Sequence, residues 1–155
     1  HTAAFLLTHG ARGISFSLES SLQDCSAIKR CFQERYAVDA PFFYTVYGRA
    51  ELMLSEYCPI NSVICNHTDR NCGLCRQGAE YALLDVKQNR YPILCDESCR
   101  THILHYEVRN HIDSIPEAKQ HGIQHFLCTF TMEGEADCHR IITACKAQLQ
   151  MKQGV

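Results

Sequence analysis

The sequence lacks an excess of charge of either sign and lacks any long apolar run. Its 155 residues include 15 Lys and Arg and 17 Asp and Glu, which leaves a net charge of −2. This balance gives no compositional sign of nucleic-acid binding, and no acidic tail indicates disorder. The apolar runs are far shorter than the roughly 18 residues that a membrane span requires, so the sequence predicts no membrane partner.

Two motifs of well-known hydrolases are also absent. There is no Gly-x-Ser-x-Gly elbow and no His-Glu-x-x-His helix. A protease needs a nucleophile beside a base, or a water activated by a metal ion, and neither can be identified from such a motif here. No apolar signal-peptide region precedes the first element, which favours a reducing, cytoplasmic location.

Cysteine is what the sequence has in quantity. There are eleven cysteines, an odd number, in a chain long enough to build a core without disulfides. In a reducing compartment such thiols are available to bind metal. Five of them lie on or at the edge of apolar stripes or strands and are predicted to be core residues: Cys25, Cys31, Cys128, Cys138 and Cys145.

The pattern of apolar residues alternates between strand and helix periods along most of the chain. The predicted elements are a helix tail at 3–8, a strand at 13–17, a helix at 18–36, a strand at 42–47, a hairpin formed by 81–86 and 91–95, a strand at 103–108, a helix from Asp113 to Gly122, a strand at 124–131 and a final helix through 138–149.

This order predicts an α/β fold of parallel βα units with a cysteine-rich β-hairpin insertion at about residues 49–100. Four such units amount to half of a (β/α)8 TIM-type barrel, which usually takes about 250 residues. Residues 1–155 are therefore interpreted as a single domain or a fragment, the C-terminal half-barrel. The expected partner is the remaining half of the barrel or a second copy, because a half-barrel leaves unpaired strand edges.

Six cysteines fall inside the insertion: Cys58, Cys65, Cys72, Cys75, Cys95 and Cys99. The C-x2-C and C-x3-C spacings flank a hairpin, as in a zinc ribbon with Cys72, Cys75, Cys95 and Cys99 as ligands. Alternatively, Cys58, Cys72, Cys75 and one later cysteine could hold an iron–sulfur cluster, which also needs four thiolates. A third interpretation is that these are reduced thiols with no metal.

Residues 47–60, YGRAELMLSEYCPI, resemble the G-R-x-E-L-M-x-S-x-Y-C-P stretch of the U32 peptidase family, also called collagenase-like proteases. Further segments are similar to the family in the same order: 14–19, 72–76, 84–85 with 91–93, 96–100, and 122–123 followed by a strand and Glu133. The resemblance spans nearly the whole chain.

The resemblance implies a barrel-type catalytic domain with peptidase activity of the hydrolase class. Other family members carry a [4Fe–4S] cluster and support hydroxylation of RNA bases or of a quinone precursor. Cys58, Cys72, Cys75 and Cys99 match the family's cysteines, with Cys65 and Cys95 as second choices. The chain departs from the family pattern at Glu51 and Glu56, where a cysteine and a glycine are expected.

Charged residues beside the cysteines are the candidates for catalysis or for orienting a substrate: Arg49, Glu51, Arg100 and His102. A salt bridge between Arg49 and Glu51 would explain those two equally well. Three functions follow as hypotheses: a U32-type peptidase, an iron–sulfur-dependent hydroxylation factor for RNA or a cofactor precursor, and a non-catalytic zinc-ribbon-like module. The substrate, peptide or RNA, is left open.

Overall fold

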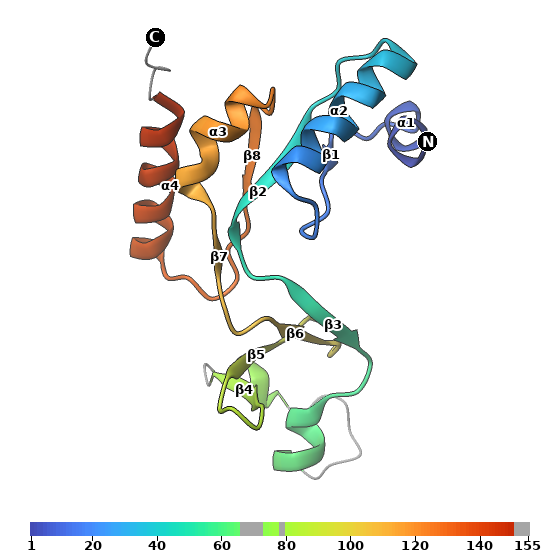
Figure 1. Cartoon of the computed structure of the whole chain (residues 1–155). Helices are drawn as coiled ribbons and strands as arrows, with labels where there is room; N and C mark the ends of the chain where they lie inside the picture. Colours follow the sequence, from blue (N-terminus) through green and yellow to red (C-terminus); the bar gives the residue numbers. More distant parts are fainter. Residues whose placement is uncertain (66–72, 78–79, 151–155) are drawn as a thin grey trace. The chain divides into compact units, whose positions relative to one another are not determined.

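The computed structural model describes residues 1–65, 73–77 and 80–150. The chain divides into two compact units, one formed by His1–Gly48 with Arg109–Val155 and the other by Arg49–Val108 (Figure 1). The second unit is therefore inserted into the first in chain order. It covers the predicted cysteine-rich insertion and eight further residues.

The sheet of the first unit is built around β2 (Phe42–Gly48). β2 pairs in parallel with β1 (Ile14–Ser15) on one side and with β8 (His125–Cys128) on the other. β7 (Arg109–Asn110) adds a short antiparallel pairing at the end of β2. The predicted α/β class with parallel strands is confirmed, and among the described residues the sheet does not close into a barrel.

Helices precede, connect and follow the parallel strands in the order that the sequence pattern predicts. They are α1 (Thr2–Thr8), α2 (Leu22–Tyr36), α3 (Ile115–Gln120) after the short helix η3 (Ile112–Ser114), and α4 (Glu135–Gln150). α2 begins at Ser21, whose hydroxyl accepts from the Asp24 amide while the Asp24 carboxylate accepts from the Ser21 amide. No helix in the described part of the chain is long and apolar enough to cross a membrane.

Side chains of one helix cap the end of the next. Ser26 and Lys29 of α2 donate to the carbonyls of His121 and Gly122, at 3.0 and 2.7 Å, where α3 ends. Lys119 of α3 donates to the carbonyl of Leu149 in α4 at 3.0 Å. These bonds satisfy carbonyls that a helix end leaves without partners. Successive helices are thereby held side by side, as in a run of βα units.

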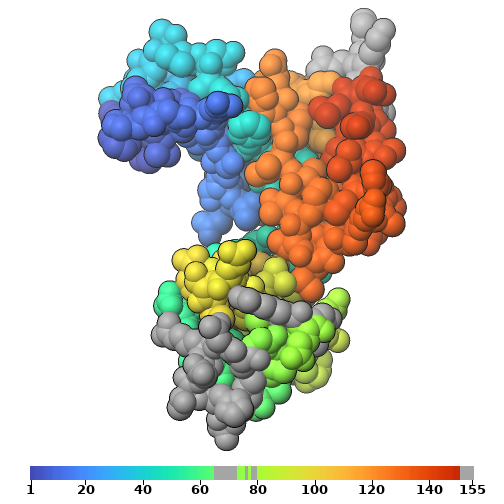
Figure 2. All heavy atoms as spheres, turned by 180° about the vertical axis from the view of Figure 1, so that it is seen from behind, coloured from blue at the N-terminus to red at the C-terminus, as the bar shows by residue number. Residues whose placement is uncertain are grey.

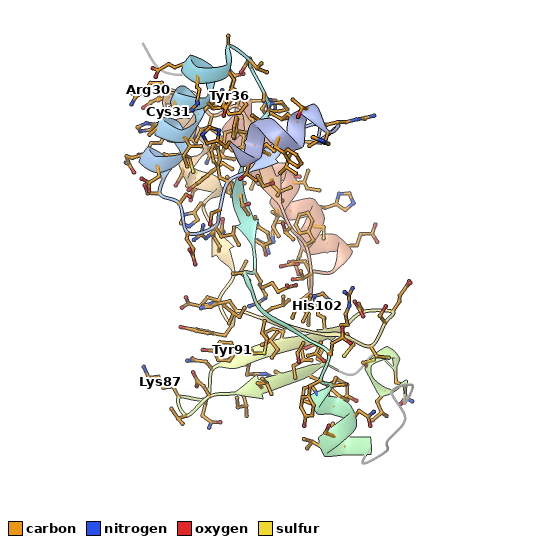
Figure 3. All side chains as sticks on the ribbon, turned by 90° about the vertical axis from the view of Figure 1, so that its right-hand side faces the viewer. Arg30, Cys31, Tyr36, Lys87, Tyr91 and His102 are labelled. Atoms are coloured by element: carbon orange, nitrogen blue, oxygen red, sulfur yellow. The ribbon has the colours of Figure 1, made fainter. Side chains whose placement is uncertain are left out.

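The core of the first unit lies between β2 and the helices. Phe42 of β2 stacks on Phe16 and meets the edge of Phe32 from α2. Cys25 and Cys145 are buried, as predicted. Cys128 and Cys138 are only partly buried, and the prediction for Cys31 is wrong because it lies on the solvent side of α2 (Figure 3). Most of α4 faces solvent (Figure 2).

The second unit is an antiparallel sheet in the order β3–β6–β5–β4. Its strands are β3 (Glu51–Ser55), β4 (Tyr81–Leu84), β5 (Arg90–Cys95) and β6 (Thr101–Leu104), with the short helices η1 (Asn61–Cys65) and η2 (Leu74–Arg76) between β3 and β4. The β4–β5 hairpin is confirmed. The strand predicted at 103–108 as a member of the parallel sheet is wrong, because residues 101–104 pair with β3 and β5 instead.

The second unit has a small core. Its buried side chains are Ile60, Asn61, Ile93, Thr101 and Leu104. Its exposed large apolar side chains are more numerous: Leu52, Met53, Leu54, Tyr57, Val63, Ile64, Leu83, Leu84 and Val86. Units of about 60 residues are marginally stable on hydrophobic burial alone, and a bound metal is one common supplement.

Candidate metal centre

Three thiols of the second unit come from separate elements. Cys58 precedes η1, Cys75 lies in η2, and Cys95 ends β5. Burial, followed by the neighbouring thiols of Cys58 and Cys75, raises the pKa of Cys95 to about 12, and Cys75 also hydrogen-bonds to Cys95. A cation bound to the Cys95 sulfur would reverse this effect and favour the thiolate.

Local backbone geometry presents the first two thiols. The Asn61 amide donates to Cys58 Sγ at 3.4 Å, and the Ser62 amide and hydroxyl both donate to the Cys58 carbonyl. Gly73 precedes η2 with φ of 71°, a left-handed conformation that glycine adopts without strain. The turn predicted from the C-x2-C sequence includes Cys72, which lies outside the described residues, so it stays a prediction.

Thr101 lies directly opposite Cys95 across the β5–β6 pair. It is 0% exposed. A side-chain hydrogen bond between its hydroxyl and the Cys95 thiol lowers the pKa of that thiol, against the larger effect of burial. Sequence reasoning missed Thr101, although its position two residues after the second cysteine of the C-x3-C spacing could have indicated it.

The donor set fits a thiolate-bound metal in its chemistry, because zinc and iron–sulfur clusters both take cysteine sulfur. Taken alone, the described residues contain no group of three His, Cys, Asp or Glu side chains that could hold a metal ion as they stand. Cys72 and the side chain of Cys65 lie outside the described residues. The described contacts link Cys58 and Cys75 to Cys95, which was a second choice, but the three thiols do not form a group that could hold a metal ion by themselves.

The turn at residues 96–100 carries Cys99. The carboxylate of Asp96 accepts from the amides of Ser98 and Arg100 and from Arg100 Nε, at 2.9, 2.9 and 2.7 Å. These bonds, the Arg100 amide foremost, lower the pKa of Asp96 to about 2. Cys99 has φ of 59°. The turn at 85–89 repeats this design, with Asp85 as the acceptor and Gln88 at φ of 65°.

Three of the four catalytic candidates share one network on the sheet. His102 Nδ1 lies 2.7 Å from Glu51 Oε2, and His102 Nε2 lies 3.6 Å from Asp96 Oδ2, which also binds Arg100. A bulge in β3 between Glu51 and Met53 turns Glu51 to the face on which His102 lies. Figure 3 shows His102 on this sheet. Sequence reasoning missed Asp96, which joins the candidates.

Arg49 lies apart from this network. Its Nη1 donates to the main-chain carbonyls of His105 and Tyr106, so the expected salt bridge with Glu51 is replaced by separate partners for the two residues. The His105 and Tyr106 rings stack, and Tyr91 meets both edge-on. Arg49 therefore fixes the segment after β6, which is a structural role.

The Glu51–His102 contact predicts a pH dependence. The hydrogen bond to Glu51 raises the pKa of His102 above its usual 6.5. Its stabilisation is fully present below that value and is lost as the pH rises through the higher pKa of the folded state. Glu51→Gln is expected to lower the His102 pKa measured by NMR titration. Equal His102 titration curves in the two proteins would contradict this assignment.

The Glu51–His102 contact can also be tested through the denaturation midpoint of the chain. The difference in denaturation midpoint between the original chain and Glu51→Gln should be larger at about pH 5.5 than at about pH 8.5, because only protonated His102 forms the ion pair.

Comparisons with protein-family models, curated proteins and solved structures find no match to this chain.

Proposed function

We propose that this chain is part of a U32-type protein and that its Arg49–Val108 unit binds a [4Fe–4S] cluster, serving an iron–sulfur-dependent hydroxylation factor. The observation that supports the proposal is the contact of the Cys95 thiol with Cys75, together with the Asn61 amide that donates to Cys58 Sγ at 3.4 Å. Cys72 completes the set, because the C-x2-C spacing pairs it with Cys75.

The participation of Cys58 favours a cluster over a zinc ribbon. A ribbon would take its ligands from Cys72, Cys75, Cys95 and Cys99 and would leave Cys58 unused. The Cys58 thiol instead acts on Cys95 and receives the Asn61 amide. Amide donors to sulfur are typical of cluster sites, where they adjust the reduction potential.

We further propose that the parallel strands and successive helices of the first unit are the later half of a TIM-type barrel, completed by the remaining half or by a second copy. Peptidase activity remains a prediction from the resemblance. The geometry of His102 does not favour it, because both ring nitrogens face carboxylates, whereas a catalytic base must face a nucleophile or a water.

A bound cluster would supply one-electron transfer. The chain's own residues prepare the place for it: the Asn61 amide orients Cys58, and Asp96 fixes the turn between Cys95 and Arg100. The near-neutral charge of the chain gives no sign of RNA binding by this part alone. The proposal therefore leaves RNA and a cofactor precursor as the two substrate classes, in a reducing compartment such as the cytoplasm.

The test is to purify the chain anaerobically and to measure its visible absorbance and its iron, zinc and sulfide content. A brown protein with about four iron and four sulfide per chain is expected. A colourless protein with one zinc per chain would replace the cluster with a zinc module. A protein that contains neither iron nor zinc would overturn the proposal. Deletion of the gene should then remove a base hydroxylation or block a quinone-type pathway.

A further inference from the structure

Two thiols of the first unit lie in contact, and neither belongs to the candidate metal centre. Cys128 ends β8 and Cys145 lies within α4, 17 positions later in the sequence, and their sulfur atoms are 3.6 Å apart. A disulfide bond holds two sulfur atoms at about 2.0 Å, so an approach of about 1.5 Å separates this pair from a covalent link.

The helix that carries Cys145 rests on the rest of the unit through few buried side chains. Its buried residues are Ile141 and Cys145, which lie four positions apart and therefore on one face of the helix. Most of the other residues of α4 are exposed. A helix with so few buried contacts can shift by the distance that the two sulfur atoms need, because little packing resists the movement.

The two thiols differ in their access to solvent. Cys128 is partly exposed, whereas Cys145 is 9% exposed. Burial, followed by the neighbouring thiol of Cys145, raises the pKa of Cys128 to about 12. Its thiolate is therefore scarce near neutral pH, which makes Cys128 a poor catalytic nucleophile. Slow oxidation to a disulfide is still open to it, because the second thiol of the bond is already beside it.

We propose that Cys128 and Cys145 form a reversible dithiol–disulfide pair, which a low-molecular-weight disulfide such as glutathione disulfide oxidises. The Cys128 thiolate attacks that disulfide and forms a mixed disulfide, and the glutathione thiolate that leaves takes up the proton that Cys128 lost. The Cys145 thiolate then attacks the Cys128 sulfur, which closes the protein disulfide and releases the second glutathione in the same way.

The net reaction passes two electrons and two protons from the pair to the oxidant. Its product ties α4 covalently to β8, so the helix is held in place by a bond as well as by packing. The inference goes beyond the proposed function, because it needs neither a metal nor the second unit. Excess reduced glutathione reverses the reaction.

The experiment incubates the reduced 155-residue chain with mixtures of reduced and oxidised glutathione, then quenches it with acid, unfolds it and alkylates the remaining thiols. Cleavage after Lys, Arg and Glu places Cys128, Cys138 and Cys145 in separate peptides for mass spectrometry. We expect a linked pair of the Cys128 and Cys145 peptides, lighter than their sum by two hydrogen atoms. Cys25, which is 0% exposed, should remain alkylated.

Two single variants test the order of the steps. Cys145→Ser should accumulate the mixed disulfide of Cys128 with glutathione, because the thiol that resolves it is missing. Cys128→Ser should leave Cys145 without glutathione, because Cys145 is buried. In the original chain, oxidation should slow hydrogen exchange of the α4 amides by about tenfold or more, since a disulfide that closes a loop of this length opposes detachment of the helix.

Three results would overturn the proposal. One is the absence of the linked peptides at the highest proportion of oxidised glutathione, in a chain that circular dichroism shows to be folded. Another is a link between Cys145 and Cys138 as abundant as the link to Cys128, which would indicate unselective oxidation. The third is unchanged hydrogen exchange in α4 after oxidation, which would mean that the disulfide does not fix the helix.

Discussion

Cys95→Ala is expected to remove the metal from the purified chain and to lower Co(II) affinity by about a hundredfold or more. The estimate follows because a thiolate site draws roughly 10–16 kcal/mol from four ligands, and one is lost. The second unit should also lose thermal stability, since a metal bound to it would supplement its small core. Metal analysis, Co(II) absorption and the unfolding temperature measure the three effects.

Cys99→Gly is the matched comparison, because the U32 resemblance implies Cys99 as a ligand, whereas the described contacts favour Cys95. Glycine adopts φ of 59° without strain, so this variant removes the thiol without distorting the turn and should keep its metal. Gln88→Gly, in the similar turn at 85–89, measures the effect of relieving backbone strain without removing a thiol. Loss of metal in Cys99→Gly with retention in Cys95→Ala would restore the ligand set that the resemblance implies.

Gly48→Ala is expected to destabilise the first unit by about 2–5 kcal/mol, the largest single effect on the fold. Gly48 has φ of 139°, and an added Cβ would lie 2.7 Å from the backbone carbonyl oxygen of Thr129. The backbone cannot yield there, because the Thr129 amide donates to the carbonyl of Tyr47 at 2.9 Å. Urea denaturation followed by circular dichroism measures the loss.

Gly122→Ala separates conformational strain from this clash. Gly122 has φ of 79°, yet a Cβ built on it would meet nothing within 4 Å. Its cost should be about 1–2 kcal/mol, the usual penalty for a left-handed residue with a side chain. Equal losses of unfolding free energy in Gly48→Ala and Gly122→Ala would show that the contact with Thr129 contributes nothing to the effect.

Much of the first unit was predictable because its signals are local. Pro116 and the polar residues before it predict the start of α3, and the nearly continuous apolar run at 42–47 predicts a strand covered on both faces. The strand at 101–104 was assigned to the wrong sheet for the opposite reason. An apolar run predicts a strand, but only pairing across the chain, here Thr101 with Cys95 and Ser55, decides which sheet it joins.

The candidate site was predictable in its residue types and less so in its membership. The spacing of the cysteines pointed to residues 58–99, and the structure adds a hydrogen bond between Cys75 and Cys95. Alternation along β5 and β6 puts Cys95 and Thr101 on one face and His102 on the other. Thr101 and His102 are neighbours in the sequence but lie on opposite faces of the sheet, which the sequence pattern alone did not reveal.

The pairing of Gly48 with Arg109 has a consequence for how such a protein can change over evolution. The residue before the second unit and the residue after it are register partners in the first unit. A cassette that enters and leaves a scaffold through neighbouring positions can be lengthened, exchanged or deleted without altering the distance that the scaffold must span. The chemistry in the cassette can therefore diverge while the α/β scaffold remains the same.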